Sequence, residues 1–152
     1  MLIKTVSALL YTSDSYILLH RHPKFGMFLG PGGHLDDNEH QYMALEREIF
    51  EETGLFISLG EYCIDDIRLK VMSPTWTVAS KLNSGDVMIN DTYSIKVNEK
   101  IRLQKLITES DNEMGWYDIQ FALDNFPMFA DTRLKIEDIR NNLQREVIYF
   151  AR

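Results

Sequence analysis

Apolar and polar residues alternate, or apolar residues run together, in two N-terminal stretches of the chain. These are residues 2–12 and 16–21, with the polar sequence Thr12-Ser13-Asp14-Ser15 between them. Alternation interrupted by turn-forming residues predicts a β-hairpin. Residues 70–85 are less regular and contain turn-forming residues, so loop or turn is predicted there. Further strands are predicted as one or two within 56–69, one over 86–98 and a short one around 113–118.

Helical spacing replaces alternation toward the C-terminus. It predicts a long helix over residues 131–150 and a shorter one near 119–125, ending before Pro127. The apolar positions of the long helix are Leu134, Ile136, Ile139, Leu143, Val147 and Phe150. An internal helix is predicted to begin at Asn38 and to end at Gly54, a residue typical of helix C-termini. Strands first, one helix inside and helices last predict an α/β fold, with a mixed β-sheet sandwiched between helices.

Three glutamates gather near the end of the internal helix. Glu48, Glu51 and Glu52 stand at i, i+3 and i+4 and therefore share one face, with Cβ atoms about 5–6 Å apart. Carboxylates in a last helical turn face the negative end of the helix dipole and repel one another, each effect costing about 0.3–0.5 kcal/mol. A divalent cation over that face would offset this cost. An all-oxygen cluster suits Mg²⁺ or Mn²⁺ better than zinc.

A glycine-rich turn, Gly30-Pro31-Gly32-Gly33, lies just before this helix. Such a turn allows close approach of the backbone to a ligand, and the Gly32 carbonyl is a candidate further ligand for a hard cation. Arg47 can pair with Glu51 at i, i+4 and orient that carboxylate. The opposite side of the helix is apolar and is predicted to pack on the protein interior.

Composition limits the kinds of partner. The 152 residues predict a single domain over 1–152, and the net charge is −7. Residues 36–52 hold seven acids and one base, so most of that charge belongs to the acidic helix region. This argues against a nucleic-acid partner. Cys63 is the only cysteine, so no disulfide framework is expected. No stretch has the apolar length of a membrane span, and a cytoplasmic protein is predicted.

The spacing of the glycine turn and the acidic helix resembles the signature box of the Nudix hydrolases. Residues 33–55 fill every defining position, from Gly33 through Glu39 to Arg47-Glu48-Ile49-Phe50-Glu51-Glu52-Thr53-Gly54-Leu55. Phe28 and Gly30 depart from the residues that many members carry in the preceding segment. The resemblance implies a Nudix-type α/β/α sandwich and metal-dependent hydrolysis of a nucleoside diphosphate linked to another group. Its small-molecule substrate could be a nucleoside triphosphate, an ADP-ribose-like compound, a nucleotide sugar or a dinucleoside polyphosphate.

The same resemblance implies roles for individual residues. Metal ligands would be Gly32 through its carbonyl, Glu48, Glu51 and Glu52, with Glu48 also a candidate base. Catalysis would involve these glutamates and Arg47, supported by Gly33, Glu39 and Gly54. A further glutamate from a downstream loop would be Glu109 or Glu113, with Glu109 preferred.

Substrate contacts are predicted on the basic cluster beside the turn and on nearby aromatic residues. Arg21 and Lys24 are candidates for phosphate binding, with a solvated strand edge as the alternative. Phe28 is a candidate for stacking on a base, with a position in the core as the alternative. Residues 69–71 match neither the ADP-ribose nor the dinucleoside polyphosphate subfamily pattern, so the substrate stays open. A non-catalytic nucleotide-binding or sensing domain, and formation of a homodimer, also stay open.

Overall fold

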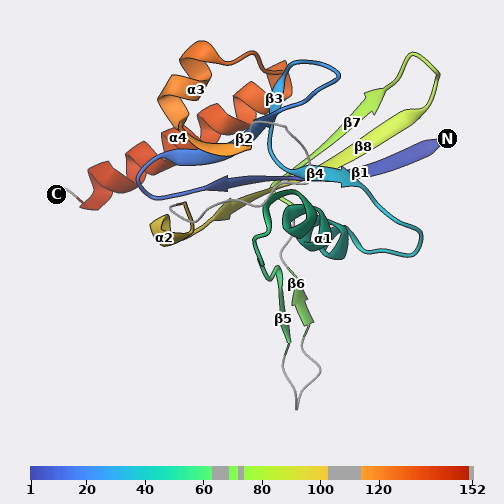
Figure 1. Cartoon of the computed structure of the whole chain (residues 1–152), viewed down its shortest axis with the longest axis horizontal. Coiled ribbons are helices and arrows are strands. Elements are labelled where there is room, and N and C mark those ends of the chain that lie inside the picture. Colours follow the sequence, from blue (N-terminus) through green and yellow to red (C-terminus); the bar gives the residue numbers. More distant parts are fainter. Residues whose placement is uncertain (63–68, 72–73, 103–113, 151–152) are drawn as a thin grey trace. The chain divides into compact units, whose positions relative to one another are not determined.

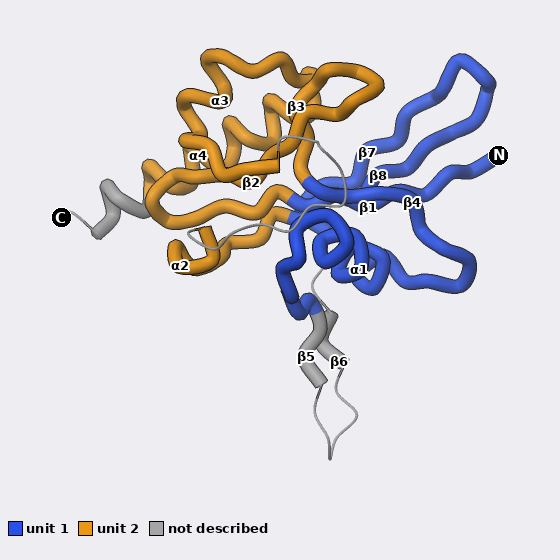
Figure 2. Tube along the Cα trace, in the orientation of Figure 1, with its two compact units in different colours: residues 1–8, 31–93, 107–109 blue, residues 9–30, 94–106, 110–152 orange. Residues whose placement is uncertain are grey.

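A computed structural model describes residues 1–62, 69–71, 74–102 and 114–150, with only the backbone described for 60–62, 69–71 and 146–150 (Figure 1). The chain divides into two compact units, which are described separately (Figure 2). Unit 1 contains residues 1–8, 31–93 and 107–109, and unit 2 contains 9–30, 94–106 and 110–152. The prediction of a single domain over 1–152 stays a prediction.

Unit 1 contains the glycine turn and the acidic helix. The first strand, β1 (Leu2–Tyr11), begins in this unit and pairs antiparallel with β4 (Gly32–His34), with Val6 opposite Gly33. The predicted glycine turn therefore includes a short strand. The helix that follows, α1 (Gln41–Thr53), buries Ala44, Leu45 and Ile49.

The ends of α1 differ in how well the sequence predicts them. The prediction that the helix begins at Asn38 is wrong. Asn38 has a positive φ of 64°, and the N-cap residue is His40, which makes no side-chain capping hydrogen bond. The predicted end is confirmed: Gly54 takes a left-handed conformation with φ 75°, and its N–H donates to the Phe50 carbonyl. Glycine is the residue that adopts this conformation without steric cost.

Two antiparallel strand pairs complete unit 1. The long strand β8 (Val87–Lys96) confirms the strand predicted over 86–98 and pairs with β7 (Trp76–Lys81). The prediction of loop or turn is wrong for β7, because this strand is largely exposed and contains no buried residue that would mark it. A small separate sheet pairs β5 (Gly60–Tyr62) with β6 (Leu69–Val71).

Unit 2 is built around the predicted hairpin. The end of β1 meets β2 (Tyr16–Arg21), with Tyr11 opposite Ile17. Strands β3 (Phe28–Leu29) and β9 (Gly115–Asp118) also pair antiparallel with β2. The buried residues of β2 are Ile17, Leu18, Leu19 and His20.

Helices α2 (Glu99–Arg102), α3 (Ile119–Asn125) and α4 (Ala130–Phe150) belong to unit 2. The structure confirms both predicted C-terminal helices, and Asp118 caps α3 by accepting a hydrogen bond from the Phe121 N–H at 2.9 Å. On α4, Ile136, Ile139 and Leu143 are buried as predicted, whereas Leu134 is 66% exposed. The polar residues Thr132 and Lys135 extend the buried face instead, each with only 7% exposed.

The predicted α/β class, with a mixed sheet and helices, is confirmed. Within the part of the chain that the structure describes, no helix is both long and apolar enough to cross a membrane.

Candidate functional site

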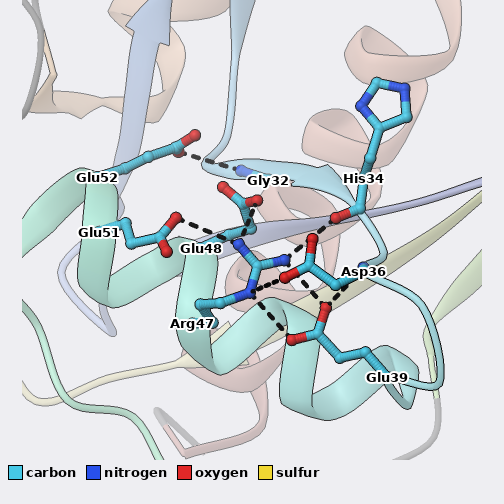
Figure 3. Close-up of polar contacts among 8 residues, drawn as sticks. All are labelled: Gly32, His34, Asp36, Glu39, Arg47, Glu48, Glu51 and Glu52. Atoms are coloured by element: carbon cyan, nitrogen blue, oxygen red, sulfur yellow. Dashed lines mark hydrogen bonds and ion pairs between the residues drawn. The ribbon is translucent and has the colours of Figure 1, made fainter.

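Helix α1 presents the three glutamates on a face that adjoins its buried residues, since Ala44 lies one turn before Glu48. The side chain of Glu48 is 15% exposed and that of Glu51 is 40% exposed. Ala44 and Leu45 are fully buried one turn earlier and hold the helix against the interior of unit 1. The buried residues therefore fix the helix. Figure 3 shows the side chains of Glu48, Glu51 and Glu52 projecting from it.

Glycines 32 and 33 bring the backbone of β4 directly against these carboxylates. The Gly32 N–H donates a hydrogen bond to Glu52 Oε2 at 3.1 Å. A Cβ atom added to Gly33 would lie 2.5 Å from Glu48 Oε1, and one added to Gly32 would lie 2.2 Å from the Val6 carbonyl oxygen. Neither position has room for a side chain. Gly33 thus permits the contact of β4 with the acidic helix, and Gly32 permits its contact with β1. The supporting role of Gly33 stays a prediction.

Arg47 is the centre of the polar network in this site (Figure 3). Its Nε and Nη2 atoms donate to the two carboxylate oxygens of Glu39 at 2.9 and 3.0 Å. Its Nη1 atom donates to Glu48 Oε1 at 2.9 Å and to Glu51 Oε2 at 3.2 Å. The predicted pair with Glu51 is confirmed, and the guanidinium also fixes the carboxylates of Glu39 and Glu48. Two parallel bonds to Glu39 give the geometry that an arginine fork provides.

The segment between β4 and α1 contributes two further contacts to Arg47. Its Nη2 donates to the His34 carbonyl oxygen at 3.2 Å, and its Nε lies 3.5 Å from Asp36 Oδ2. Glu39 Oε1 also accepts a hydrogen bond from the Asp36 N–H at 2.9 Å. Sequence reasoning did not assign Asp36 or the His34 carbonyl to the site. A carboxylate near a key arginine could have suggested Asp36, but no sequence signal marks a backbone carbonyl.

The pKa values reflect this arrangement. The hydrogen bond from Arg47 holds the pKa of Glu39 below its ordinary value. Burial raises the pKa of Glu48, and the hydrogen bond from Arg47 opposes that rise. The pKa of Arg47 is raised in turn, chiefly by its hydrogen bond to Glu39. Glu48 therefore has an increased affinity for a proton.

The donor atoms match the type that a hard cation prefers. Carboxylate oxygens and a backbone carbonyl are the usual ligands of Mg²⁺ and Mn²⁺. Across the described residues, no three His, Cys, Asp or Glu side chains are grouped so that they could hold a metal ion. Glu48 and Glu51 are hydrogen-bonded to Arg47 instead, and Glu52 to the Gly32 N–H. The donor atoms are therefore of the type that Mg²⁺ or Mn²⁺ binds. In this structure the Arg47 guanidinium carries the positive charge next to the carboxylates.

Three predicted substrate-binding residues belong to unit 2. Arg21 and Lys24 are exposed, and each lies over an aromatic ring, with 5.4 Å from the Arg21 guanidinium to the Phe28 centroid. Phe28 is only 4% exposed, and its ring stacks on Phe126 at 3.9 Å. This packing places Phe28 in the core of unit 2, so we do not retain it as a base-stacking residue. Glu109, Glu113 and Cys63 lie outside the described residues.

Comparisons with known proteins agree with the fold and the motif. A family model described as NUDIX domain matches residues 1–121. Among solved structures, the chain resembles a NUDIX-family hydrolase from Clostridium perfringens, with 21% identity, TM-score 0.70, and 92% of this chain and 97% of that chain covered. A C. elegans Ap4A hydrolase matches with 16% identity, TM-score 0.68, and 93% and 98% coverage. A MutT protein from Methanosarcina mazei Go1 matches with 20% identity, TM-score 0.66, and 95% and 94% coverage.

No curated protein matches the sequence. The similarity to the solved structures shows a shared fold, and the family match covers the glycine turn, the acidic helix and most of the chain. Together with the complete signature motif at residues 33–55, these findings show that the chain belongs to the Nudix hydrolase family.

Proposed function

We propose that the protein is a metal-dependent hydrolase that cleaves the diphosphate linkage of a nucleoside diphosphate derivative. The observation that carries the proposal is the packing of Glu48 and Glu52 against the Gly32-Gly33 backbone, with Arg47 bonded to Glu48 and Glu51. Arg47 supplies only one positive charge among these carboxylates, so a further positive partner is favourable during substrate binding. A Mg²⁺-bound diphosphate supplies that partner, and Mn²⁺ could take its place.

Glu48, Glu51, Glu52 and the Gly32 carbonyl would hold the ion. When bound, the cation neutralises the diphosphate charge and makes phosphorus easier to attack. The glutamates then fix the position of the diphosphate, and Arg47 keeps Glu39 and the helix carboxylates in place. The role of Gly33 is to leave space for Glu48, whose carboxylate lies where a larger residue would place its Cβ.

In the proposed reaction, a water oxygen forms a bond to phosphorus and the bridging P–O bond breaks. The Glu48 carboxylate accepts the proton from the water. Burial raises the pKa of this group, which makes it a better base than an ordinary glutamate near neutral pH. The leaving phosphate carries away the electrons of the broken bond. The products are a mononucleotide, or another phosphomonoester, and a second phosphorylated fragment.

Several substrate classes agree with this chemistry. The solved relatives include MutT proteins and an Ap4A hydrolase, and their identities to this chain are too low to choose between them. Nucleoside triphosphates, ADP-ribose-like compounds, nucleotide sugars and dinucleoside polyphosphates all carry the required linkage. Arg21 and Lys24, both exposed, are the proposed phosphate contacts outside the box, and Glu109 is a further candidate. Location in the cytoplasm and the absence of a nucleic-acid partner stay predictions.

The test is a panel of these four substrate classes, each assayed with and without Mg²⁺. We expect Mg²⁺-dependent release of a phosphomonoester from at least one of them. Glu52→Gln should reduce kcat by about 100-fold or more while the fold is retained, because a charged metal ligand is lost. Glu46→Gln is the matched control. It lies on the same helix, and its side-chain oxygen still accepts the hydrogen bond from the Leu59 N–H.

The alternative function is a nucleotide-binding or sensing domain without turnover. It predicts that nucleotides bind, as measured by calorimetry, while no compound in the panel is hydrolysed. Full activity of Glu52→Gln would instead show that the metal assignment is wrong.

A further inference from the structure

Strand β7 has one described neighbour, β8, and its other edge faces no strand in the part of the chain that the structure describes. The β7–β8 hairpin can be followed in Figure 1. Its register is regular, with consecutive pairs from Trp76 opposite Thr92 to Lys81 opposite Val87. Just before the strand, the Thr75 N–H also donates to the Thr92 carbonyl at 2.8 Å. Natural edge strands usually carry bulges, prolines or inward-facing charges that prevent association. The sequence Trp-Thr-Val-Ala-Ser-Lys has none of these before its last residue.

Backbone geometry determines which groups of β7 point to the open edge. The Leu82 N–H donates to the Asp86 carbonyl at 2.8 Å, which makes these two residues a hydrogen-bonded pair of the ladder. Hydrogen-bonded and non-hydrogen-bonded pairs alternate along an antiparallel ladder. The even-numbered residues of β7 therefore bond to β8. The N–H and C=O groups of Thr77, Ala79 and Lys81 point away from β8.

These outward groups match themselves under two-fold symmetry. If two β7 strands pair antiparallel with Ala79 on the axis, each Ala79 bonds to the other Ala79, and Thr77 bonds to Lys81 of the second copy. All three residues whose backbone groups point away from β8 then have partners in hydrogen-bonded pairs. If the register between the two chains shifted by one residue, each outward-pointing backbone group of one β7 would face an inward-pointing group of the other. We propose that β7 pairs with β7 of a second copy of this chain, in the register centred on Ala79.

Side chains support a second copy as the occupant. In this register, Trp76 lies opposite Leu82 of the other chain, which places two apolar side chains together at each end of the pair. Lys81 lies opposite Thr77 of the other chain, whose hydroxyl donates to the Asp91 carboxylate at 2.7 Å. The Lys81 side chain of one chain thus lies on the sheet face that carries the Asp91 carboxylate of the other chain. No like charges lie opposite each other. Ala79, at the axis, has a small side chain and does not obstruct the approach.

The short strand predicts a reversible monomer–dimer equilibrium. Sedimentation equilibrium over a range of concentrations up to about 500 μM should show a mass that rises toward twice the chain mass of 17.7 kDa. Ala79→Pro should raise the dimer dissociation constant by about tenfold or more, because it removes the N–H at the axis. This N–H does not serve the β7–β8 ladder, so the monomer should keep its fold by circular dichroism. Ala79→Ser retains the N–H and is the matched control.

A cross-linking experiment tests the register itself. Residues opposed in a hydrogen-bonded pair have Cα atoms about 5.5 Å apart, within the range that a disulfide spans. In a Cys63→Ser background, Ala79→Cys should form a covalent dimer when diamide oxidises the two thiols. Ser80→Cys is the control, because Ser80 lies opposite Val78 of the second copy and two Ser80 residues are too far apart.

A wild-type chain that stays monomeric throughout the concentration range would overturn the proposal. So would a dimer that Ala79→Pro does not weaken, or equal cross-linking of Ala79→Cys and Ser80→Cys. These measurements do not depend on hydrolytic activity and are therefore independent of the proposed function.

Discussion

At the scale of single residues, Arg47 connects more of the candidate site than any carboxylate does. Its planar guanidinium donates to Glu39 through two nitrogens and reaches Glu48 and Glu51 through a third. A lysine ammonium is a compact charge without this fork, so it cannot hold the same carboxylates in one plane. The position therefore requires the shape of arginine in addition to its charge.

We expect Arg47→Lys to lower kcat/KM by about 10–100-fold, the range found when groups that orient metal ligands are changed. Positive charge is retained, so the loss reports on geometry. Steady-state kinetics with the best substrate of the panel would measure it, alongside a thermal unfolding curve. Arg145→Lys, at an exposed position, is the matched control. Unchanged kinetics in Arg47→Lys would mean that the network is not needed for activity.

Sequence spacing predicts part of this network. The i, i+4 relation predicts the Arg47–Glu51 contact, and the structure confirms it at 3.2 Å. The bonds from Arg47 to Glu39 and to the His34 carbonyl depend on how the connecting segment returns to the helix. That path follows from the left-handed conformation of Asn38, which helix-capping preferences do not indicate.

At the scale of elements, the candidate site depends on how closely β4 approaches α1. Glu52 receives the Gly32 N–H, and Glu48 fills the space beside Gly33. The strand is only three residues long, and its pairing with β1 holds it in position. The two glycines therefore serve close packing, and neither has the positive φ that would make glycine necessary for conformational reasons.

Gly33→Ala tests this contact. The new Cβ would lie 2.5 Å from Glu48 Oε1, so the carboxylate must move. Because a flexible side chain can yield, we expect a large loss of kcat, about 10-fold or more, with a small change in unfolding temperature. The control is Gly115→Ala, where the nearest atom lies at an ordinary 3.5 Å. Activity equal to wild type would show that Glu48 need not occupy its observed position.

The errors of sequence prediction at this scale arise where burial does not follow residue type. Strand β7 was missed because it is largely exposed, and the buried face of α4 was predicted only in part because polar residues take positions usually held by apolar ones. Lys135 and Thr132 are buried, while Leu134 is exposed. A hydrophobicity pattern reflects the average burial of each residue type. The burial of an individual residue depends on its tertiary packing.

At the scale of the whole molecule, a buried histidine couples stability to pH. His20 is 8% exposed, and its Nδ1 has no hydrogen-bond partner among the described residues. Burial lowers its pKa below the ordinary value of 6.5, and the nearby His22 adds to the effect, while a hydrogen bond to the Gly30 backbone opposes it. Folding therefore favours the neutral imidazole.

The sign of the pH dependence follows. Well above pH 6.5 the ring is neutral in both states, and it contributes no pH dependence. As the pH falls below that value, the unfolded chain takes up the proton first, so the free energy of unfolding decreases. Urea titrations at pH 7.5 and 5.5 should show a smaller decrease for His20→Gln than for wild type. His40→Gln, at an exposed position, should behave like wild type in this respect. Equal decreases in all three proteins would exclude this role for His20.

The charge balance around Arg47 has a consequence for the order of binding events. One guanidinium stands among the carboxylates of Asp36, Glu39, Glu48 and Glu51, so the surface remains strongly negative (Figure 3). An uncomplexed nucleotide anion would be repelled there. We expect the metal ion to bind first or together with the nucleotide. Nucleotide in excess over the metal ion would then sequester the ion and slow turnover instead of saturating the enzyme.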